Sequence, residues 1–494
     1  MSRTTKVLAL SIGEGINLVL GFLLVPYLAR AMSLEDNGTY GQVLLVVTVA
    51  VKFLSFGFSK VLFADLADES KSQASSMISN IVLVSLFGLF GLVIVLLLQE
   101  QIALHFDNDI LQGLILIYAF AIPFMLVKTS INAGLIYFGK VRPTVIVSVV
   151  TNILRLAAVF FFIQIHYSLV GVFASLLLVP IIQSLWLSLY LPKGYLNLKA
   201  IDCNIIKGQC NDGLPLGLTV TISTLFYSID GFMVSNMLGT EQFAMFRNGS
   251  VNIPIIASLY GAVNTIVLPD VTKLYGQNQI GGIVNLKKKA LHNTAGIIYP
   301  IVIFFIVFSF ILIPLYLSEK YADSFLVFSL FNGALLLRIT SYDDIYIASK
   351  NNNRLPLKYF IALVCNVISN YVFISLWGIN GAAAATLFSF FILIGLLLNG
   401  GLKILNVDLC DLIDLNKLFK TLLVPIITSS IIAFIVYYAD MPLLILPLGV
   451  LYALIVYHYF LKSKILDTQI TSFVLTKFLS NKNRIKLFFD KCYL

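Results

Sequence analysis

The feature of this sequence that most constrains its fold is a series of long, uninterrupted apolar runs. Residues 76–98 and 168–191, for example, contain no charged side chain. A stretch of about 20 apolar residues is the length that an α-helix needs to cross a bilayer. Because the runs are continuous and do not alternate with polar residues, they do not fit the strands of a transmembrane β-barrel. The sequence therefore predicts an all-α membrane protein that crosses the bilayer many times.

The composition sets the number of spans and excludes a water-soluble protein. The 494 residues are 59% hydrophobic and 12% charged, with a mean hydropathy of +0.94, whereas soluble domains are about 25% charged. About 14 spans leave loops of about 13 residues, which are too short to hold a catalytic domain. The predicted spans are residues 7–28, 41–63, 76–98, 110–136, 144–165, 168–191, 213–237, 243–268, 292–317, 325–347, 357–377, 379–400, 420–439 and 441–461.

The distribution of basic residues predicts the orientation of the spans. With the N-terminal end inside, cytoplasmic segments carry about 25 of the 33 Lys and Arg residues, and external loops carry about two, Arg30 and Lys320. Loops rich in Lys and Arg stay on the cytoplasmic side during insertion. We therefore expect both termini to be cytoplasmic. The net charge of +9 then reflects topology and not nucleic-acid binding.

Residue patterns that would support catalysis or metal binding do not occur. The five cysteines form no C-x-x-C pair, no histidine stands near them at metal-ligand spacing, and the four histidines are scattered. The sequence contains no phosphate loop of the G-x-x-x-x-G-K-[ST] type. These observations argue against an enzyme, a catalytic residue, a metal site and a bound cofactor.

An internal repeat relates the two halves of the chain. Residues 31–40 resemble residues 237–246 at a shift of 206, with Glu35 matching Glu241. An even number of spans per half gives both halves the same orientation, so we expect two lobes with a substrate path between them. Two further matches follow in the same order, at shifts of 213 and 210: Pro143 with Pro356, and Gly171 with Gly381.

The repeat predicts the domain organisation. We expect an N-terminal lobe of six spans at 1–191, a cytoplasmic linker at 192–212, a C-terminal lobe of six spans at 213–400, and two added spans at 401–461. A basic tail follows at 462–494. The tail has near-helical spacing of apolar residues, which fits either an amphipathic helix on an anionic leaflet or a frayed end.

The segment Arg-Ala-Met-Ser-Leu-Glu-Asp-Asn-Gly-Thr-Tyr after the first span resembles the multidrug/oligosaccharidyl-lipid/polysaccharide exporter (MOP) superfamily. The length, the basic character and the segments around Gly171 and Gly381 are most similar to its polysaccharide flippase branch, the Wzx-type O-antigen transporters. The resemblance covers residues 1–400. Ser33 and Ala244 stand where the superfamily usually has glycine, which weakens the match at both turns.

This resemblance implies a MATE-like, V-shaped bundle that works by alternating access in the bacterial inner membrane. Its cargo would be a polyprenyl-diphosphate-linked oligosaccharide, an O-antigen or capsule repeat unit, moved from the cytoplasmic to the outer leaflet. Membrane lipids would be partners, and the resemblance leaves the glycan polymerase machinery open as a further partner.

Charged residues inside the predicted spans are the candidates for function. Each costs about 2.5–3.5 kcal/mol at a helix centre, so such residues usually face a cavity or a partner. A diphosphate cannot cross hydrocarbon unaccompanied, and Lys and Arg supply its countercharge. We expect four basic residues to bind the headgroup: Lys52, Arg155, Arg247 and Arg338. Lys128 more simply extends its side chain to the interface.

Four acidic residues complete the set, and two interpretations of them stay open: Glu14, Asp230, Asp343 and Asp344. They could form structural ion pairs, such as Asp230 with Arg247 or Glu14 with Lys52. Alternatively, Glu14 and Asp230 could bind a coupling ion, so that transport would use an H⁺ or Na⁺ gradient.

Two other transport functions stay open beside the O-antigen prediction. A flippase for lipid II or teichoic acid differs only in its cargo. A cation-coupled drug exporter on the same fold should have an acidic and aromatic pocket. The basic residues inside the spans are at least as numerous as the acidic ones, which favours an anionic cargo.

Overall fold

The structure, a computed structural model of the chain, describes residues 3–165, 168–439, 444–463 and 465–466. These residues form α-helices and short 3₁₀ helices and no β-strand, which confirms the predicted all-α class. Among them, nine helices are long and apolar enough to cross a membrane, and a bent pair within residues 203–238 would make ten. The protein is therefore a multi-pass membrane protein, and the predicted count of 14 spans is not confirmed. The predicted tail helix lies outside the described residues.

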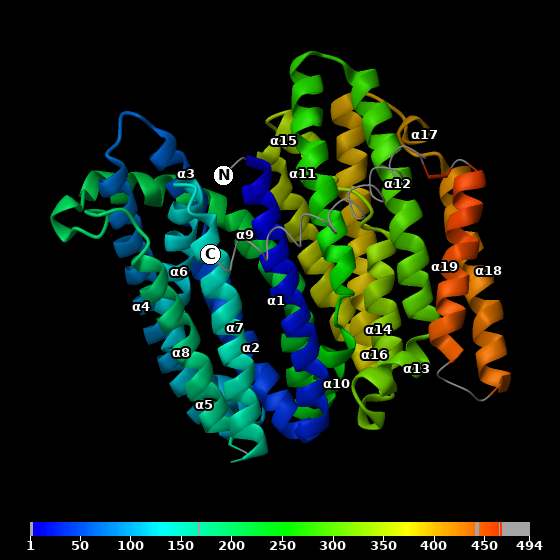
Figure 1. Ribbon diagram of the computed structural model, residues 1–494, viewed down its shortest axis with the longest axis horizontal. Helices are drawn as coiled ribbons and strands as arrows, with labels where there is room; N and C mark the ends of the chain where they lie inside the picture. The colour runs from blue at the N-terminus through cyan, green and yellow to red at the C-terminus, as the bar shows by residue number, and fades with distance from the viewer. Residues whose placement is uncertain (1–2, 166–167, 440–443, 464, 467–494) are drawn as a thin grey trace, which may run out of the picture. The chain divides into compact units, whose positions relative to one another are not determined.

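The first part of the chain contains ten α-helices and one 3₁₀ helix (Figure 1). Their bounds are α1 (Arg3–Ala31), α2 (Leu34–Ser55), α3 (Phe58–Ala67), α4 (Gln73–His105), α5 (Ile110–Tyr118), α6 (Ala121–Tyr137), α7 (Val141–Gln164), α8 (Leu169–Ser188), η1 (Leu198–Ala200), α9 (Cys203–Leu238) and α10 (Thr240–Gly249).

The helices of the second part are shorter on average and are more often interrupted. They are α11 (Pro254–Gly276), α12 (Ile280–Val307), α13 (Ser309–Tyr316), η2 (Glu319–Tyr321), α14 (Ser324–Gly333), η3 (Ala334–Leu336), α15 (Asp344–Ala348), η4 (Asn352–Arg354), α16 (Leu355–Leu405), α17 (Leu409–Leu412), α18 (Leu415–Ala439) and α19 (Ile445–Lys462).

Several predicted spans are interrupted where the sequence gives a continuous apolar run. The predicted span 41–63 is divided between α2 and α3 at Phe56, which has φ 38°. The Gly57 N–H there donates to the carbonyl oxygen of Gly213 on α9 at 3.3 Å, so a neighbouring helix satisfies the broken backbone. Four other predicted spans are also divided: 110–136, 243–268, 292–317 and 325–347.

Helix α16 is too long to be a single span. Its 51 residues would extend about 77 Å, more than twice the hydrocarbon thickness of a bilayer. Gly378 has φ 57° and ψ −136° inside it, a conformation that glycine adopts readily and other residues avoid. The predicted boundary between the spans 357–377 and 379–400 coincides with this kink.

Packing divides the chain into two compact units. Unit 1 contains Met1–Pro254, Ile313–Phe331 and Arg354–Leu393, and unit 2 contains Ile255–Leu312, Asn332–Asn353 and Ile394–Leu494. The predicted lobes at 1–191 and 213–400 rest on the sequence repeat and stay a prediction.

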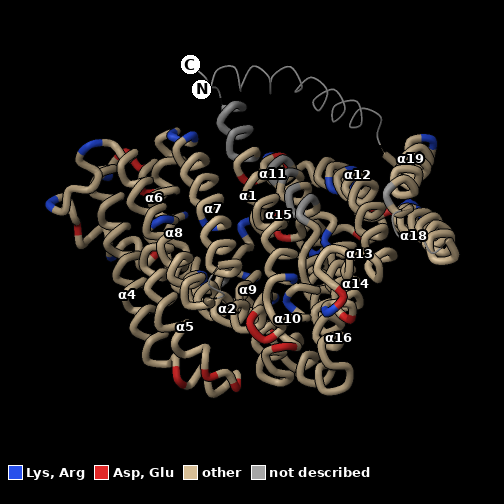
Figure 2. The backbone as a smooth tube through the Cα atoms, turned by 60° about the horizontal axis from the view of Figure 1, so that its bottom comes forward, with Lys and Arg blue, Asp and Glu red and all other residues tan. Residues whose placement is uncertain are grey.

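Unit 1 is built around the close packing of α1 on α7, α4 on α6, and α8 on both α6 and α7 (Figure 1). The apolar side chains that face inward from α1, α2, α4 to α8 form one core. The loops after α6 and α8 carry Lys140 and Lys193, and the loop after α4 carries Asp107 and Asp109. Figure 2 shows basic and acidic residues together at one end of these helices and acidic residues at the other. The predicted orientation of the spans in the membrane stays a prediction.

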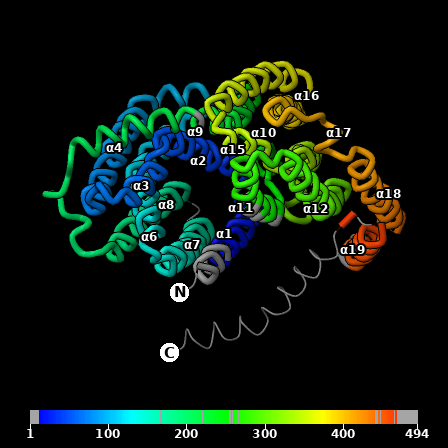
Figure 3. The backbone as a smooth tube through the Cα atoms, turned by 90° about the horizontal axis from the view of Figure 1, so that it is seen from above, coloured from blue at the N-terminus to red at the C-terminus, as the bar shows by residue number. Residues whose placement is uncertain are grey.

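Unit 2 packs α18 and α19 side by side, with α12 against both (Figure 3). Phe308, Tyr452 and Phe460 are buried at the centre of this group. The Tyr452 hydroxyl donates to the carbonyl oxygen of Pro300 at 2.8 Å, so its polar end is satisfied inside the apolar core.

Candidate functional site

The two repeated turns lie against each other in unit 1, where the N-terminal half of α2 packs on α10. A Cβ atom on Gly38 would lie 2.2 Å from the carbonyl oxygen of Thr240. Only glycine allows this approach of two backbones. We call this contact, between residues 37–42 and 240–248, the repeat joint.

Two buried amides cross the repeat joint in opposite directions. Gln42 on α2 donates through Nε2 to Ser235 Oγ at 2.7 Å and to Thr240 Oγ1 at 3.1 Å. Asn248 on α10 donates through Nδ2 to Asn37 Oδ1 at 3.0 Å. Gln42 and Asn248 are 206 residues apart, the shift of the sequence repeat. Each repeat therefore donates an amide hydrogen bond to the other repeat, from equivalent positions in the two repeats.

Arg247, a predicted headgroup residue, is part of the repeat joint. Its guanidinium carbon lies 5.3 Å from the centre of the Tyr40 ring, a cation–π contact. The side chain is partly buried and passes over Gly41, where a Cβ atom would lie 2.7 Å from Arg247 Cδ. Burial raises the pKa of the nearby Tyr321 to about 12, so that phenol stays neutral. The joint thus holds a cation among aromatic rings and amides.

Asp230 on α9 is buried, with 4% of its surface exposed. Its carboxylate accepts hydrogen bonds from Asn370 Nδ2 at 2.6 Å and from Thr386 Oγ1 at 2.7 Å. Asn370 Nδ2 also donates to Asn366 Oδ1, one turn away on α16, at 2.8 Å. Within the described part of the chain, the Asn370 Oδ1 atom is buried and accepts no hydrogen bond. The arrangement gathers several oxygen atoms around one carboxylate. Asn366, Asn370 and Thr386 are functional candidates that the sequence did not single out.

Arg155 on α7 is partly buried. Among the described residues, its Nε is buried without a hydrogen-bond partner. A cation with an unused donor inside an apolar region favours an anion beside it. Lys128 on α6 is also partly buried.

The other predicted residues of unit 1 lie at more open positions. Lys52, in the last turn of α2, and Glu14, on α1, are both exposed. Asp230 is bonded to Asn370 and Thr386, which differs from the alternative in which it pairs with Arg247.

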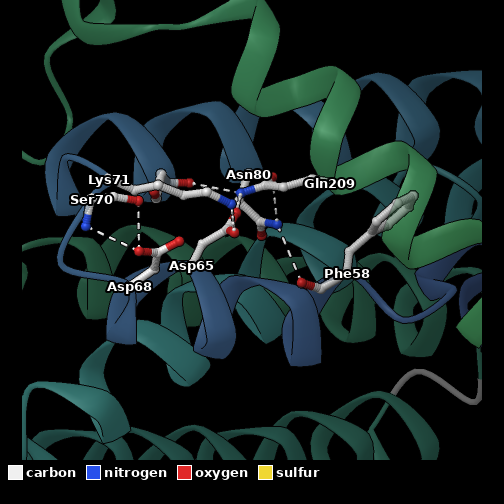
Figure 4. A network of polar contacts seen from close by, with 8 residues as sticks. Phe58, Asp65, Asp68, Ser70, Lys71, Asn80 and Gln209 are labelled. Atoms are coloured by element: carbon white, nitrogen blue, oxygen red, sulfur yellow. Dashed lines mark hydrogen bonds and ion pairs between the residues drawn. The ribbon is translucent and has the colours of Figure 1, made fainter.

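A polar network ties the start of α9 to α3 and α4 (Figure 4). Asp65 accepts hydrogen bonds from Lys71 Nζ at 2.5 Å and from Gln209 Nε2 at 2.8 Å. Asn80 Nδ2 donates to Gln209 Oε1 at 3.0 Å and to the carbonyl oxygen of Phe58 at 3.3 Å. The hydrogen bond to Asp65 raises the pKa of Lys71. This network anchors the first turns of α9, which lie within the predicted linker 192–212, so the second part of that linker is helical.

An apolar pocket of about 560 Å³ lies between α2, α4 and α9. It is lined by Ala50, Phe53, Gly91, Leu98, His105 and Phe232, among others, and by no Lys, Arg, Asp or Glu. Its chemistry suits hydrocarbon and not a phosphate group. Anion binding therefore has to be sought at the basic residues.

In unit 2, Asp344 forms an ion pair, one of the two roles left open for it, with a lysine that the sequence did not single out. Lys287 Nζ on α12 lies 2.7 Å from Asp344 Oδ2, and both side chains are 2% exposed. Lys287 also donates to Thr340 Oγ1 at 3.2 Å and to the carbonyl oxygen of Ser341. Lys287 does not stand out in the sequence, because the predicted span begins at residue 292 and so leaves Lys287 in the preceding loop. The available signal was the apolar face that Lys287 shares with Leu291, four residues on.

Arg338 and Asp343 lie in the same part of unit 2. The Arg338 guanidinium carbon is 5.5 Å from the centre of the Tyr260 ring. Both Arg338 and Asp343 are partly exposed. The structure thus brings together Arg338, Asp343 and Asp344 in one segment, which is not helical between residues 337 and 343.

The fold defines a class of protein, the multi-pass α-helical membrane proteins. The family of polysaccharide biosynthesis proteins matches residues 4–274, more than half of the chain, and the chain belongs to this family. No curated protein matches the chain.

Solved structures of transporters share the fold. The lipid II flippase MurJ in an inward closed conformation is 19% identical, with a TM-score of 0.73 over 93% of this chain and 100% of its own. An inward-facing multidrug resistance MATE transporter is 15% identical, with a TM-score of 0.65 over 81% and 98%. A MOP superfamily transporter from Pyrococcus furiosus is 15% identical, with a TM-score of 0.60 over 81% and 95%. The predicted resemblance to a polysaccharide flippase family agrees with the family match, and the fold is the one that MurJ and the MATE transporters have.

Proposed function

We propose that this protein is a flippase that moves a polyprenyl-diphosphate-linked oligosaccharide, an O-antigen or capsule repeat unit, from the cytoplasmic to the outer leaflet. It works in the bacterial inner membrane by alternating access, with both termini in the cytoplasm. The carried lipid and the surrounding membrane lipids are its partners, and the glycan polymerase machinery would receive the product. Lys52, Arg155, Arg247 and Arg338 bind the anionic headgroup.

The observation that carries this proposal is the buried donor of Arg155. An arginine whose Nε is buried without a partner in the described structure retains an unused donor. A phosphate group can accept from Arg through two parallel N–H bonds and neutralise its charge. A cationic drug would instead be repelled by this charge.

The test is a flipping assay in vesicles with a fluorescent polyprenyl-diphosphate oligosaccharide. Arg155→Met should reduce the flipping rate by at least about tenfold, because the headgroup loses a charged hydrogen bond. Arg142→Met is the matched control, since Arg142 lies exposed at the end of the same helix. Normal flipping by Arg155→Met, or normal flipping by both Arg247→Ala and Lys52→Ala, would count against the proposal.

We also propose that Asp230 binds a coupling cation. Hard cations take oxygen ligands, and Asp230, Asn366, Asn370 and Thr386 bring carboxylate, amide and hydroxyl oxygens together. Asp230, and with it Glu14, would make transport depend on an H⁺ or Na⁺ gradient, whereas Asp344 is neutralised by Lys287. Collapse of the gradient across the vesicle membrane should then stop net transport.

A flippase for lipid II or teichoic acid is the second candidate, favoured by the shared fold with the lipid II flippase MurJ. Deletion of the gene separates the candidates, because the cargo that accumulates in the cytoplasmic leaflet differs. An accumulated lipid-linked O-antigen or capsule unit supports our proposal, and accumulated lipid II contradicts it.

A further inference from the structure

The predicted span 325–347 is interrupted in its interior. The 3₁₀ helix η3 ends at Leu336, α15 begins at Asp344, and residues 337–343 between them are not helical. A broken helix at membrane depth is tolerated only where neighbouring groups satisfy its backbone. The partners of the exposed carbonyl groups therefore show whether the break is built into the fold.

Side chains satisfy four carbonyl groups at the start of this segment and inside it, in two adjacent pairs at residues 336 and 337 and at residues 340 and 341. Three of the donors are tyrosine hydroxyls and the fourth is Lys287. Tyr299 donates to Leu336 at 2.9 Å, Tyr342 to Leu337 at 3.4 Å, Tyr260 to Thr340 at 3.5 Å, and Lys287 to Ser341. The donors come from α11, α12 and the segment itself. The interruption is thus a fixed structure and not a frayed helix end.

Lys287 has no capacity left to bind a ligand. An ammonium group has three N–H donors. Those of Lys287 are used by Asp344 Oδ2, Thr340 Oγ1 and the carbonyl oxygen of Ser341. The other oxygen of Asp344, Oδ1, accepts from the Ile345 N–H at 2.8 Å. Because both charged side chains are buried and fully bonded, they act on their neighbours and not on a substrate.

The neighbour that bears on transport is Arg338, which lies inside the interrupted segment. Tyr260 connects the two features, since its ring lies under the Arg338 guanidinium and its hydroxyl bonds to Thr340. Thr340 is also bonded to Lys287. A short path of contacts therefore joins the buried ion pair to Arg338.

We propose that Lys287 and Asp344 hold the segment 337–343 in its non-helical form and so fix the position of Arg338 for a phosphate-bearing headgroup. Lys287 is a positioning residue in this assignment. The inference rests on the headgroup role proposed above for Arg338, and adds a residue that the substrate does not touch.

The experiment uses the full-length protein in lipid nanodiscs with geranylgeranyl diphosphate as the probe. It compares Lys287→Met, Arg338→Ala and their combination, with Lys288→Met as the matched control on the same helix. Lys287→Met should weaken probe binding by about tenfold, as Arg338→Ala does, and the combination should lose no more than either. Lys287→Arg should restore part of the binding. Additive losses, or unchanged binding in Lys287→Met, would overturn the proposal.

A second variant guards against misfolding of Lys287→Met, which leaves Asp344 buried without its partner. Lys287→Met with Asp344→Asn removes both charges and keeps the size of each side chain, and losing a whole buried ion pair is tolerated better than losing one partner. Ser341→Cys is introduced in a background without the native cysteines. Its rate of labelling by a thiol reagent measures how accessible the segment 337–343 is. We expect normal thermal stability, faster labelling and weak probe binding.

Unchanged labelling and binding in this double variant would overturn the proposal. A different result, faster labelling of the double variant together with normal probe binding by Arg338→Ala, would overturn the headgroup role of Arg338 instead. The failure of the positioning role is therefore distinguished from that of the proposed function.

Discussion

The backbone at Gly38 touches the backbone at Thr240, because a Cβ atom at Gly38 would lie 2.2 Å from the Thr240 carbonyl oxygen. This contact lies at the centre of the repeat joint, where Gln42 donates to Thr240 and Asn248 donates to Asn37. In the alternating access that we propose, contacts between the two repeats such as this one would open and close.

The first prediction concerns this contact. Gly38→Ala should destabilise the protein by about 1–3 kcal/mol, because the added methyl group forces α2 and α10 apart. Thermal unfolding in detergent measures the effect. Gly395→Ala on α16 is the control, since a Cβ atom there meets nothing within 4 Å. Equal melting temperatures for the two variants would show that the close contact does not occur.

The second prediction separates the charge of Arg247 from its packing. Arg247→Lys keeps the charge but loses the planar group over Tyr40, so flipping should fall severalfold, whereas Arg247→Ala should stop it. Tyr40→Phe preserves the aromatic face and should stay near wild type. Both measurements use the vesicle assay, after the amount of protein in the membrane has been matched. Full activity in Arg247→Ala is the contrary result.

The third prediction concerns Asp230. Asp230→Asn keeps the size of the side chain but removes the charge that a cation would balance, so transport should no longer respond to an H⁺ or Na⁺ gradient. Asp212→Asn is the matched control, because Asp212 is an exposed residue on the same helix, α9. A gradient response that persists in Asp230→Asn would exclude Asp230 as the coupling site.

The fourth prediction is a pH dependence at the start of α18. Asp414 Oδ1 accepts from the Lys417 N–H at 3.0 Å, and this bond lowers the pKa of Asp414 below its ordinary 3.8. A carboxylate with a lowered pKa stabilises the fold above pH 3.8 and loses that contribution as the pH falls through the folded-state pKa. Asp414→Ala should cost about 1 kcal/mol at pH 7 and less at pH 2.5, as measured by unfolding in detergent. An equal cost at both pH values would rule out this cap.

Local pattern explains why much of the fold could be predicted. A run such as 76–98 is apolar on all sides, and in a bilayer only a helix satisfies its backbone, so the class of fold follows without any tertiary contact. The kink at Gly378 was also visible as a boundary between two runs. The breaks at Phe56 and at 337–343 were not, because the groups that satisfy them come from distant helices.

The residues of the candidate site also fall into those that the sequence singles out and those that only the structure reveals. Charges inside apolar runs, such as Arg155 and Asp230, stand out in the sequence because they are costly in hydrocarbon. Their partners do not stand out. Asn370 and Thr386 are 140 and 156 residues from Asp230 along the chain, and neither is unusual in a membrane helix.

By itself, the sequence determined that this chain is a helical membrane protein with an internal repeat and with charge placed inside the bilayer, because those properties depend on length, periodicity and the cost of burying charge. Only the tertiary structure decided which charges are neutralised and which helices are interrupted. Lys287 and Asp344 are 57 residues apart, and their pairing follows from the packing of α12 against a broken segment. Such pairing depends on the positions of separate helices in space, which no local pattern encodes.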